Sequence, residues 1–275
     1  DDGIAVAMIM ALLDSNDIPH PPIEAVFTTD EEVGMGGAMA IDLSVLKGRK
    51  LINIDSEEEG ILTTGCAGGF RYETLIPVHR ERKTGTVVTL KIHGLQGGHS
   101  GIEIHKQRGN AHKMMGRLLN HIGKSVEISL AEINGGSKDN VIAMESTAEI
   151  LVADKDAAAV KAMADEMKAV WDNEFMGDEP GLAVEADTSA DSTVDVCDKA
   201  GTERVISYLV TCPYGVQGYS RKLKGLVETS MNIGILETAA DHVKTVYLAR
   251  SSVESKKQEM KEVLAKAGIV NYSIW

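Results

Sequence analysis

Acidic residues form three groups in the first quarter of the chain, where their side chains could hold a metal ion. One group begins with Asp1, another is the run Asp30, Glu31 and Glu32, and the third begins with Asp55. The second and third groups each follow a short apolar segment of the strand type. The carboxyl ends of parallel strands meet at one edge of a sheet, so these carboxylates should converge there. Because converging carboxylates repel one another unless a cation lies among them, the pattern predicts a metal site.

Each acidic group also has an ordinary structural interpretation, as a helix cap, a solvated turn or a charged loop. The elements between the groups favour a common site. The apolar pattern predicts a helix over residues 4–13, a strand over 23–29, a helix over 37–46 and a strand over 51–54. This alternation of helix and strand is typical of a mostly parallel α/β sheet.

After Pro77 the pattern changes to the order of an α+β domain. Strands are expected at 86–93, 126–133 and 148–153, with helices at 109–122 and 155–175. The later strands 226–236 and 243–250 and the helix 256–267 repeat the strand-strand-helix ending, which is a weak internal echo. We therefore expect part of a catalytic domain at 1–80, an inserted, extended lid domain at 81–268, and a return to the catalytic domain at 269–275.

The composition excludes several classes of protein. The net charge of −13 would repel a phosphate backbone, so nucleic acid is not an expected partner. No apolar run reaches the roughly 18 to 20 residues that span a bilayer, so no membrane segment is expected. The 3 cysteines are widely separated and lack the spacing of a zinc ribbon or a disulfide framework, which fits a reducing cytoplasm.

Five strings of residues resemble the co-catalytic zinc peptidases, a family that includes carnosinase, aminoacylase and succinyl-diaminopimelate desuccinylase. They are D-D-G-I-A at 1–5, T-T-D-E-E-V-G-M-G-G-A at 28–38, N-I-D-S-E-E-E-G-I-L-T-T-G-C-A-G-G at 53–69, G-L-Q-G-G-H-S-G-I-E-I-H at 94–105 and G-G-S-K-D-N-V-I at 135–142. Within the family the chain is most similar to the aminoacyl-histidine (Xaa-His) dipeptidases. The resemblance implies zinc-dependent hydrolysis of dipeptides such as carnosine.

The resemblance also implies roles for the acidic residues. Asp1 corresponds to the carboxylate that bridges two zinc ions, Glu32 to a ligand of one ion and Asp55 to a ligand of the other. Glu31 corresponds to the general base that takes a proton from the metal-activated water and delivers it to the leaving amine. Other divalent metals could replace zinc.

Three residues of the lid domain are candidates for substrate contact. His99 resembles the lid histidine that stabilises the oxyanion, although alone it could be an ordinary histidine in a glycine turn. Asn140 matches a lid residue that binds the substrate backbone, or equally a turn former. Many relatives carry an arginine where this chain has Ala153, so we take Arg250 as the candidate anchor for the substrate carboxylate, against the alternative of a surface arginine.

The family's two histidine zinc ligands have no counterpart in this sequence, which looks like an internal segment of a longer chain. Three carboxylates are too few to complete two zinc sites, so we expect this segment alone to bind zinc weakly and to be inactive. A homodimer through the lid domain is expected from the resemblance. Two alternatives stay open: a related amidohydrolase that deacylates N-acyl amino acids, and a lid fragment that serves as a dimerisation module.

Overall fold

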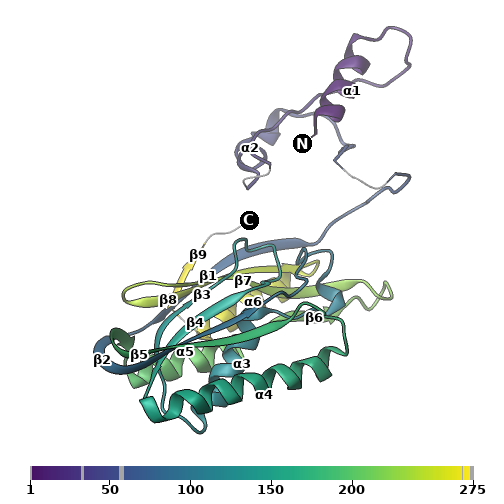
Figure 1. The fold of residues 1–275 in the computed structure, drawn as a ribbon. Helices are drawn as coiled ribbons and strands as arrows, with labels where there is room; N and C mark the ends of the chain where they lie inside the picture. Colours follow the sequence, from purple (N-terminus) through teal and green to yellow (C-terminus); the bar gives the residue numbers. More distant parts are fainter. Residues whose placement is uncertain (1, 32–33, 56–58, 268, 273–275) are drawn as a thin grey trace. The chain divides into compact units, whose positions relative to one another are not determined.

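The structure is a computed structural model that describes residues 2–31, 34–55, 59–267 and 269–272 (Figure 1). It divides into two compact units, Asp1–Thr64 and Gly65–Trp275. In the described part of the chain no helix combines the length and the apolar character needed to cross a membrane.

The first unit is helical where it is regular. Helix α1 (Gly3–Asp14) confirms the helix expected over 4–13, while the segment expected as one helix over 37–46 forms α2 (Gly36–Ala40) and the 3-10 turn η1 (Leu43–Val45). Between them the backbone is extended at Ile41 and Asp42, and the Asp42 carboxylate caps η1 by accepting the Ser44 N–H at 2.9 Å.

The prediction of strands over 23–29 and 51–54 is wrong. The described residues of this unit contain no strand. A strand of a parallel sheet is buried between hydrogen-bonded neighbours and covering helices. Here Leu51 and Ile52 are 90% and 83% exposed. Apolar character alone therefore does not make these segments strands in the absence of pairing partners.

The second unit contains two antiparallel sheets, with strand orders β6-β7-β8-β1-β9 and β3-β4-β2-β5. The strands are β1 (Gly68–Pro77), β2 (Arg80–His93), β3 (Ser129–Asn134), β4 (Ser146–Val152), β5 (Ala183–Cys197), β6 (Gly215–Tyr219), β7 (Val227–Thr238), β8 (His242–Ser251) and β9 (Ile269–Tyr272). The helices are α3 (Ala111–Gly123), α4 (Ala157–Phe175), α5 (Lys199–Thr211) and α6 (Glu254–Ala267), with short 3-10 turns η2 (Ile104–Lys106) and η3 (Asp154–Asp156). The expected α+β order is thus confirmed, whereas no strand was predicted at β1, β5, β6 or β9 and no helix at α5.

The two sheets share one topology. In the four-stranded sheet the order β3-β4-β2-β5 has α3 before β3 and α4 after β4; in the other sheet the order β7-β8-β1-β9 has α5 before β7 and α6 after β8. The whole first set, β2 to β5, is inserted between β1 and α5 of the second. The internal echo in the sequence is therefore present as a repeated, nested topology.

The two halves of this repeat are joined through strands β3 and β7 and through helices α3 and α5. Gly135 and Leu236 exchange backbone hydrogen bonds of 2.9 and 3.0 Å, and the Thr238 hydroxyl accepts the Ile133 N–H at 2.8 Å. In α3, a Cβ on Gly116 would lie 2.5 Å from Leu209 of α5, so only a glycine allows this close packing. The edge strand and helix of one half thus contact their counterparts in the other.

Helices of the second unit cover one face of its sheets, and among the described residues of this unit no helix covers the other face of the five-stranded sheet (Figure 1). On the covered face lie buried apolar side chains such as Phe70, Tyr72 and Tyr247. Because side chains alternate along a strand, the opposite face of β1 and β8 carries Arg71 and Arg250. Strands β1 and β9 belong to this second unit; the functional division 1–80, 81–268 and 269–275 stays a prediction.

Candidate active site

The predicted metal ligands are only partly placed by the structure. Asp1 and Glu32 lie outside the described residues, whereas Glu31 and Asp55 are described and exposed. Among the residues that are described, no group of three or more histidine, cysteine or acidic side chains is arranged to hold a metal ion. The predicted convergence of the acidic groups therefore stays a prediction.

Backbone hydrogen bonds link the residues on either side of the segment that carries Glu31. Asp30 adopts a left-handed backbone with φ of 62°, and its carbonyl accepts the Met35 N–H at 2.7 Å. The Gly37 N–H donates to the Thr29 carbonyl at 3.0 Å, and a Cβ on Gly37 would collide with the Thr29 backbone. The glycine at position 37 thus allows the chain to approach itself closely, and Glu31 lies exposed in the segment ahead of α2.

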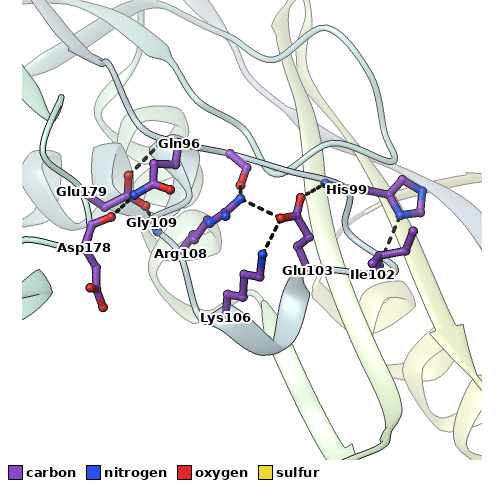
Figure 2. A network of polar contacts seen from close by, with 10 residues as sticks. Gln96, His99, Ile102, Glu103, Lys106, Arg108, Gly109, Asp178 and Glu179 are labelled. Carbon is purple, nitrogen blue, oxygen red and sulfur yellow. Dashed lines mark hydrogen bonds and ion pairs between the residues drawn. The ribbon is translucent and has the colours of Figure 1, made fainter. Parts of the chain in front are cut away.

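His99 is half-buried and held by its own loop (Figure 2). Its ring Nδ1 accepts the Ile102 N–H at 3.2 Å, and its backbone N–H donates to the Glu103 carboxylate at 3.1 Å. A ring nitrogen that accepts a hydrogen bond carries no proton, so the proton of the neutral ring is on Nε2. Nε2 is the atom that could donate to an oxygen of a bound substrate.

Asn140 lies directly beside the His99 loop. Its carbonyl accepts the Ser100 N–H at 2.8 Å, the Gly98 carbonyl accepts the Ile142 N–H at 2.9 Å, and His99 forms a β-bridge with Val141. Two loops that are distant in sequence are therefore joined by backbone hydrogen bonds at the two candidate residues.

A buried asparagine on β7 holds the Asn140 loop through two hydrogen bonds. The Asn232 side-chain amide donates to the carbonyls of Asp139 and Val141 at 2.8 and 2.9 Å, which are the residues on either side of Asn140. Asn232 is 1% exposed. It was not identified from the sequence, although a polar residue between Met231 and Ile233 in an apolar strand is a recognisable signal of a buried hydrogen-bonding role.

Arg250 reaches the same place from strand β8. A Cβ on Gly101 would lie 2.9 Å from Cε1 of His99 and 3.0 Å from Nε of Arg250, so both side chains pack against this glycine. Burial lowers the pKa of the Arg250 guanidinium, while the nearby Asp139 carboxylate opposes that shift. The Arg250 Nε is buried and has no hydrogen-bond partner among the described residues.

The structure thus brings His99, Asn140 and Arg250 together on the helix-free face of the five-stranded sheet. A buried guanidinium nitrogen without a partner is costly unless a ligand satisfies it, and a carboxylate is the best-matched ligand. Beside it, the neutral imidazole N–H of His99 can donate to a polar group of a small molecule. Arg71, on the same face, differs from Arg250 because its Nε forms an ion pair with the Asp139 carboxylate at 3.1 Å.

Known proteins with similar sequences point to the same family. Residues 90–179 match the peptidase dimerisation domain. Over 270 residues the chain is 34% identical to the cytosol non-specific dipeptidase of Escherichia coli (strain K12), an alignment that covers 98% of the chain. The resemblance to dipeptidases is confirmed.

The fold of the dipeptidase-like chain agrees with its sequence. The crystal structure of aminoacylhistidine dipeptidase from Vibrio alginolyticus matches it with a TM-score of 0.83 and 33% identity over 97% of the chain. The mixed α/β class is thereby confirmed. The chain spans 56% of the Escherichia coli relative and 55% of the Vibrio chain, which is about half the length of each.

Proposed function

We propose that the protein containing this chain is a metal-dependent dipeptidase that accepts Xaa-His dipeptides such as carnosine. The observation that carries this proposal is the convergence of His99, Asn140 and Arg250 at one place in the second unit. Similarity to a dipeptidase over 98% of the chain supports the same reaction.

Each of the three residues has a role that its geometry allows. Arg250 binds the C-terminal carboxylate of the dipeptide, which satisfies its unpartnered Nε. Asn140 binds the polar backbone of the substrate. The Nε2–H of His99 donates to the oxygen of the scissile carbonyl, where negative charge develops during attack by water. Because this charge exists only in the transition state, the His99 bond should act mainly on kcat.

The metal site is proposed at Asp1, Glu32 and Asp55, with Glu31 as the general base. A set of carboxylates is chemically suited to divalent cations, and Glu31 is exposed, so it can exchange a proton with a bound water. Two zinc ions bound there would polarise the scissile carbonyl and acidify the attacking water.

A homodimer and a cytoplasmic location complete the proposal. The match to a peptidase dimerisation domain supports self-association, and the name of the Escherichia coli relative supports the cytosol. Strand β3 and helix α3 already contact β7 and α5 of the same chain. We therefore place the contact between two copies on other surfaces of the lid domain. Sedimentation of the protein over a range of concentrations tests this, and a strict monomer would rule it out.

The decisive experiment compares substrates with the whole protein and added zinc. Release of histidine from β-Ala-His is expected to exceed release of acetate from acetyl-amino acids, because only the dipeptide has the free amine that a dipeptidase accepts. The variant Glu31→Gln should abolish turnover, whereas Arg250→Gln should mainly raise KM. Faster release of acetate would assign the protein instead to the amidohydrolases that deacylate N-acyl amino acids.

A further inference from the structure

The loop that carries His99 is closed at its base by one carboxylate. Glu179 accepts the Gln96 N–H at 2.8 Å with Oε2 and the Gly109 N–H at 2.9 Å with Oε1 (Figure 2). Gln96 and Gly109 are the two ends of the segment 96–109, and His99 lies between them. A single side chain therefore joins the start and the end of this segment.

Glu179 itself is held firmly in the turn between α4 and β5. It is 5% exposed, and its carbonyl accepts the Leu182 N–H at 3.1 Å. The Gln96 side-chain amide donates to the carbonyl of the neighbouring Asp178, which adds a second link between the turn and the loop. Gly94 and Gly181 pack backbone against backbone, since a Cβ on Gly181 would lie 2.5 Å from the Gly94 carbonyl oxygen.

The burial of a negative charge at this place requires an explanation. Within the described residues Glu179 forms no ion pair, and its charge is felt by Tyr214, whose pKa is raised by burial and by this carboxylate. Burying a carboxylate costs free energy, and the two backbone N–H groups offset part of that cost because each oxygen accepts one of them. A glutamine has one acceptor oxygen, and its NH2 group would face the second N–H, so only a carboxylate closes both ends.

Within the closed loop a second carboxylate holds the backbone of His99. Glu103 accepts the His99 backbone N–H and lies 2.8 Å from Lys106 and 3.2 Å from Arg108. The Arg108 guanidinium also donates to the Gly97 carbonyl at 2.5 Å. These contacts fix the shape of the loop, but they lie inside it. Glu179, with the Gln96–Asp178 bond beside it, ties both ends of the loop to the turn between α4 and β5, which lies outside it.

We propose that Glu179 is a positioning residue, which holds the segment 96–109 so that the Nε2–H of His99 is presented to the substrate. The inference rests on the proposed function for the identity of the substrate. Its structural part, that Glu179 controls the geometry and mobility of the His99 loop, stands on the hydrogen bonds at Gln96 and Gly109 and can be tested without turnover.

Hydrogen exchange tests the structural part with Glu179→Gln and a matched control, Glu174→Gln. Glu174 pairs with Arg117 of α3 at 2.6 Å on the exposed side of α4. Amides of residues 96–109 should exchange about tenfold faster in Glu179→Gln than in the control, because one end of the loop is released. Equal exchange in the loop, or an increase spread evenly over α3 and the sheets, would overturn the proposal.

NMR gives a readout that a purely structural role would not change. In Glu179→Gln the 15N shifts of the His99 ring should move toward an average of the two tautomers as the Ile102 hydrogen bond weakens. Unchanged shifts would count against the proposal. If this variant does not fold, hydrogen exchange in the unmodified protein tests the proposal instead. The Gln96 and Gly109 amides should then exchange more slowly than the other amides of residues 96–109. Exchange of both at the average rate of this segment would contradict the proposal.

Kinetics of the whole protein with zinc separates this inference from the proposed function. Glu179→Gln should lower kcat at least tenfold with little change in KM, while Glu174→Gln leaves both unchanged. A rise in KM without a fall in kcat would overturn the proposal that Glu179 acts through His99. If the unmodified protein hydrolyses no dipeptide, the proposed function fails, and the exchange and NMR results still decide whether Glu179 positions the loop.

Discussion

Arg250 lies beside His99, and burial together with the positive charge of this guanidinium lowers the pKa of the imidazole. The pairing places a cation next to a ring that is neutral and carries its proton on Nε2. Protonation of the ring would break the hydrogen bond from Ile102 to Nδ1 and add a second positive charge next to Arg250. The site therefore favours the neutral ring.

Removal of the guanidinium should raise the pKa of His99. In Arg250→Gln the repelling charge is lost and the shorter side chain leaves the ring more hydrated, and both changes favour the protonated form. An NMR titration of the His99 Cε1 proton measures the change. Arg117→Gln, on the exposed surface of α3, is the control and should leave the value unaltered. A lower or unchanged pKa of His99 in Arg250→Gln would contradict this account.

His112 should make the stability of the protein depend on pH. It is fully buried in α3, between Ser146 of β4 and the Gly234 carbonyl of β7, and burial lowers its pKa from 6.5 to about 4. The unfolded chain takes up this proton below pH 6.5 and the folded chain only near pH 4, so stability falls as the pH drops through that window. The full effect is about 3 kcal/mol.

Urea unfolding at several pH values measures this contribution. His112→Gln should unfold with a shallower dependence on pH between 6.5 and 4 than the unmodified protein, whatever its stability at pH 7. Titrating carboxylates are common to both proteins and cancel in the difference. Parallel curves for the two proteins would show that His112 does not titrate as its burial requires.

Asn232→Leu should release the Asn140 loop. The substitution removes two buried hydrogen bonds, to the carbonyls of Asp139 and Val141, and should lower the free energy of unfolding by about 2 kcal/mol. The exposed Gln217 also donates to two carbonyls, at 3.1 and 3.3 Å, so Gln217→Leu is a matched control. We expect the control to cost less than about 0.5 kcal/mol. Equal losses in chemical denaturation would show that burial of the Asn232 amide is unimportant.

Gly136→Ala should be among the most destabilising single changes in the lid. Gly136 has φ of 70°, and an added Cβ would overlap the carbonyl oxygen of Gly234 at the junction of the two halves. Gly177 has φ of 96° with open space around it, so Gly177→Ala carries only the backbone strain of about 1–2 kcal/mol. We expect Gly136→Ala to cost more than about 3 kcal/mol. Similar thermal unfolding of the two variants would refute the close approach.

The pattern of apolar residues along the sequence was sufficient to predict several helices and strands of the second unit. Strand β4 and helices α3 and α4 appear close to the predicted residues, because their apolar periodicity matches their burial. Helix α3 begins two residues later than predicted, because the Asn110 side chain accepts the His112 N–H at 3.0 Å and caps the helix. In the first unit the same reasoning was wrong for 23–29 and 51–54, because a strand requires partners that periodicity does not reveal.

The sequence by itself determined the resemblance to dipeptidases and the candidate residues, because the acidic strings, the Q-G-G-H-S-G string and Asn140 are recognisable without coordinates. Only the tertiary structure decided that Arg250 joins His99 and Asn140, and that Asn232 and Glu179 hold their loops. The physical reason is that these contacts depend on strand register and on the nesting of one half of the repeat inside the other. A side chain on β8 reaches a loop that follows β2 only after both sheets have formed and joined.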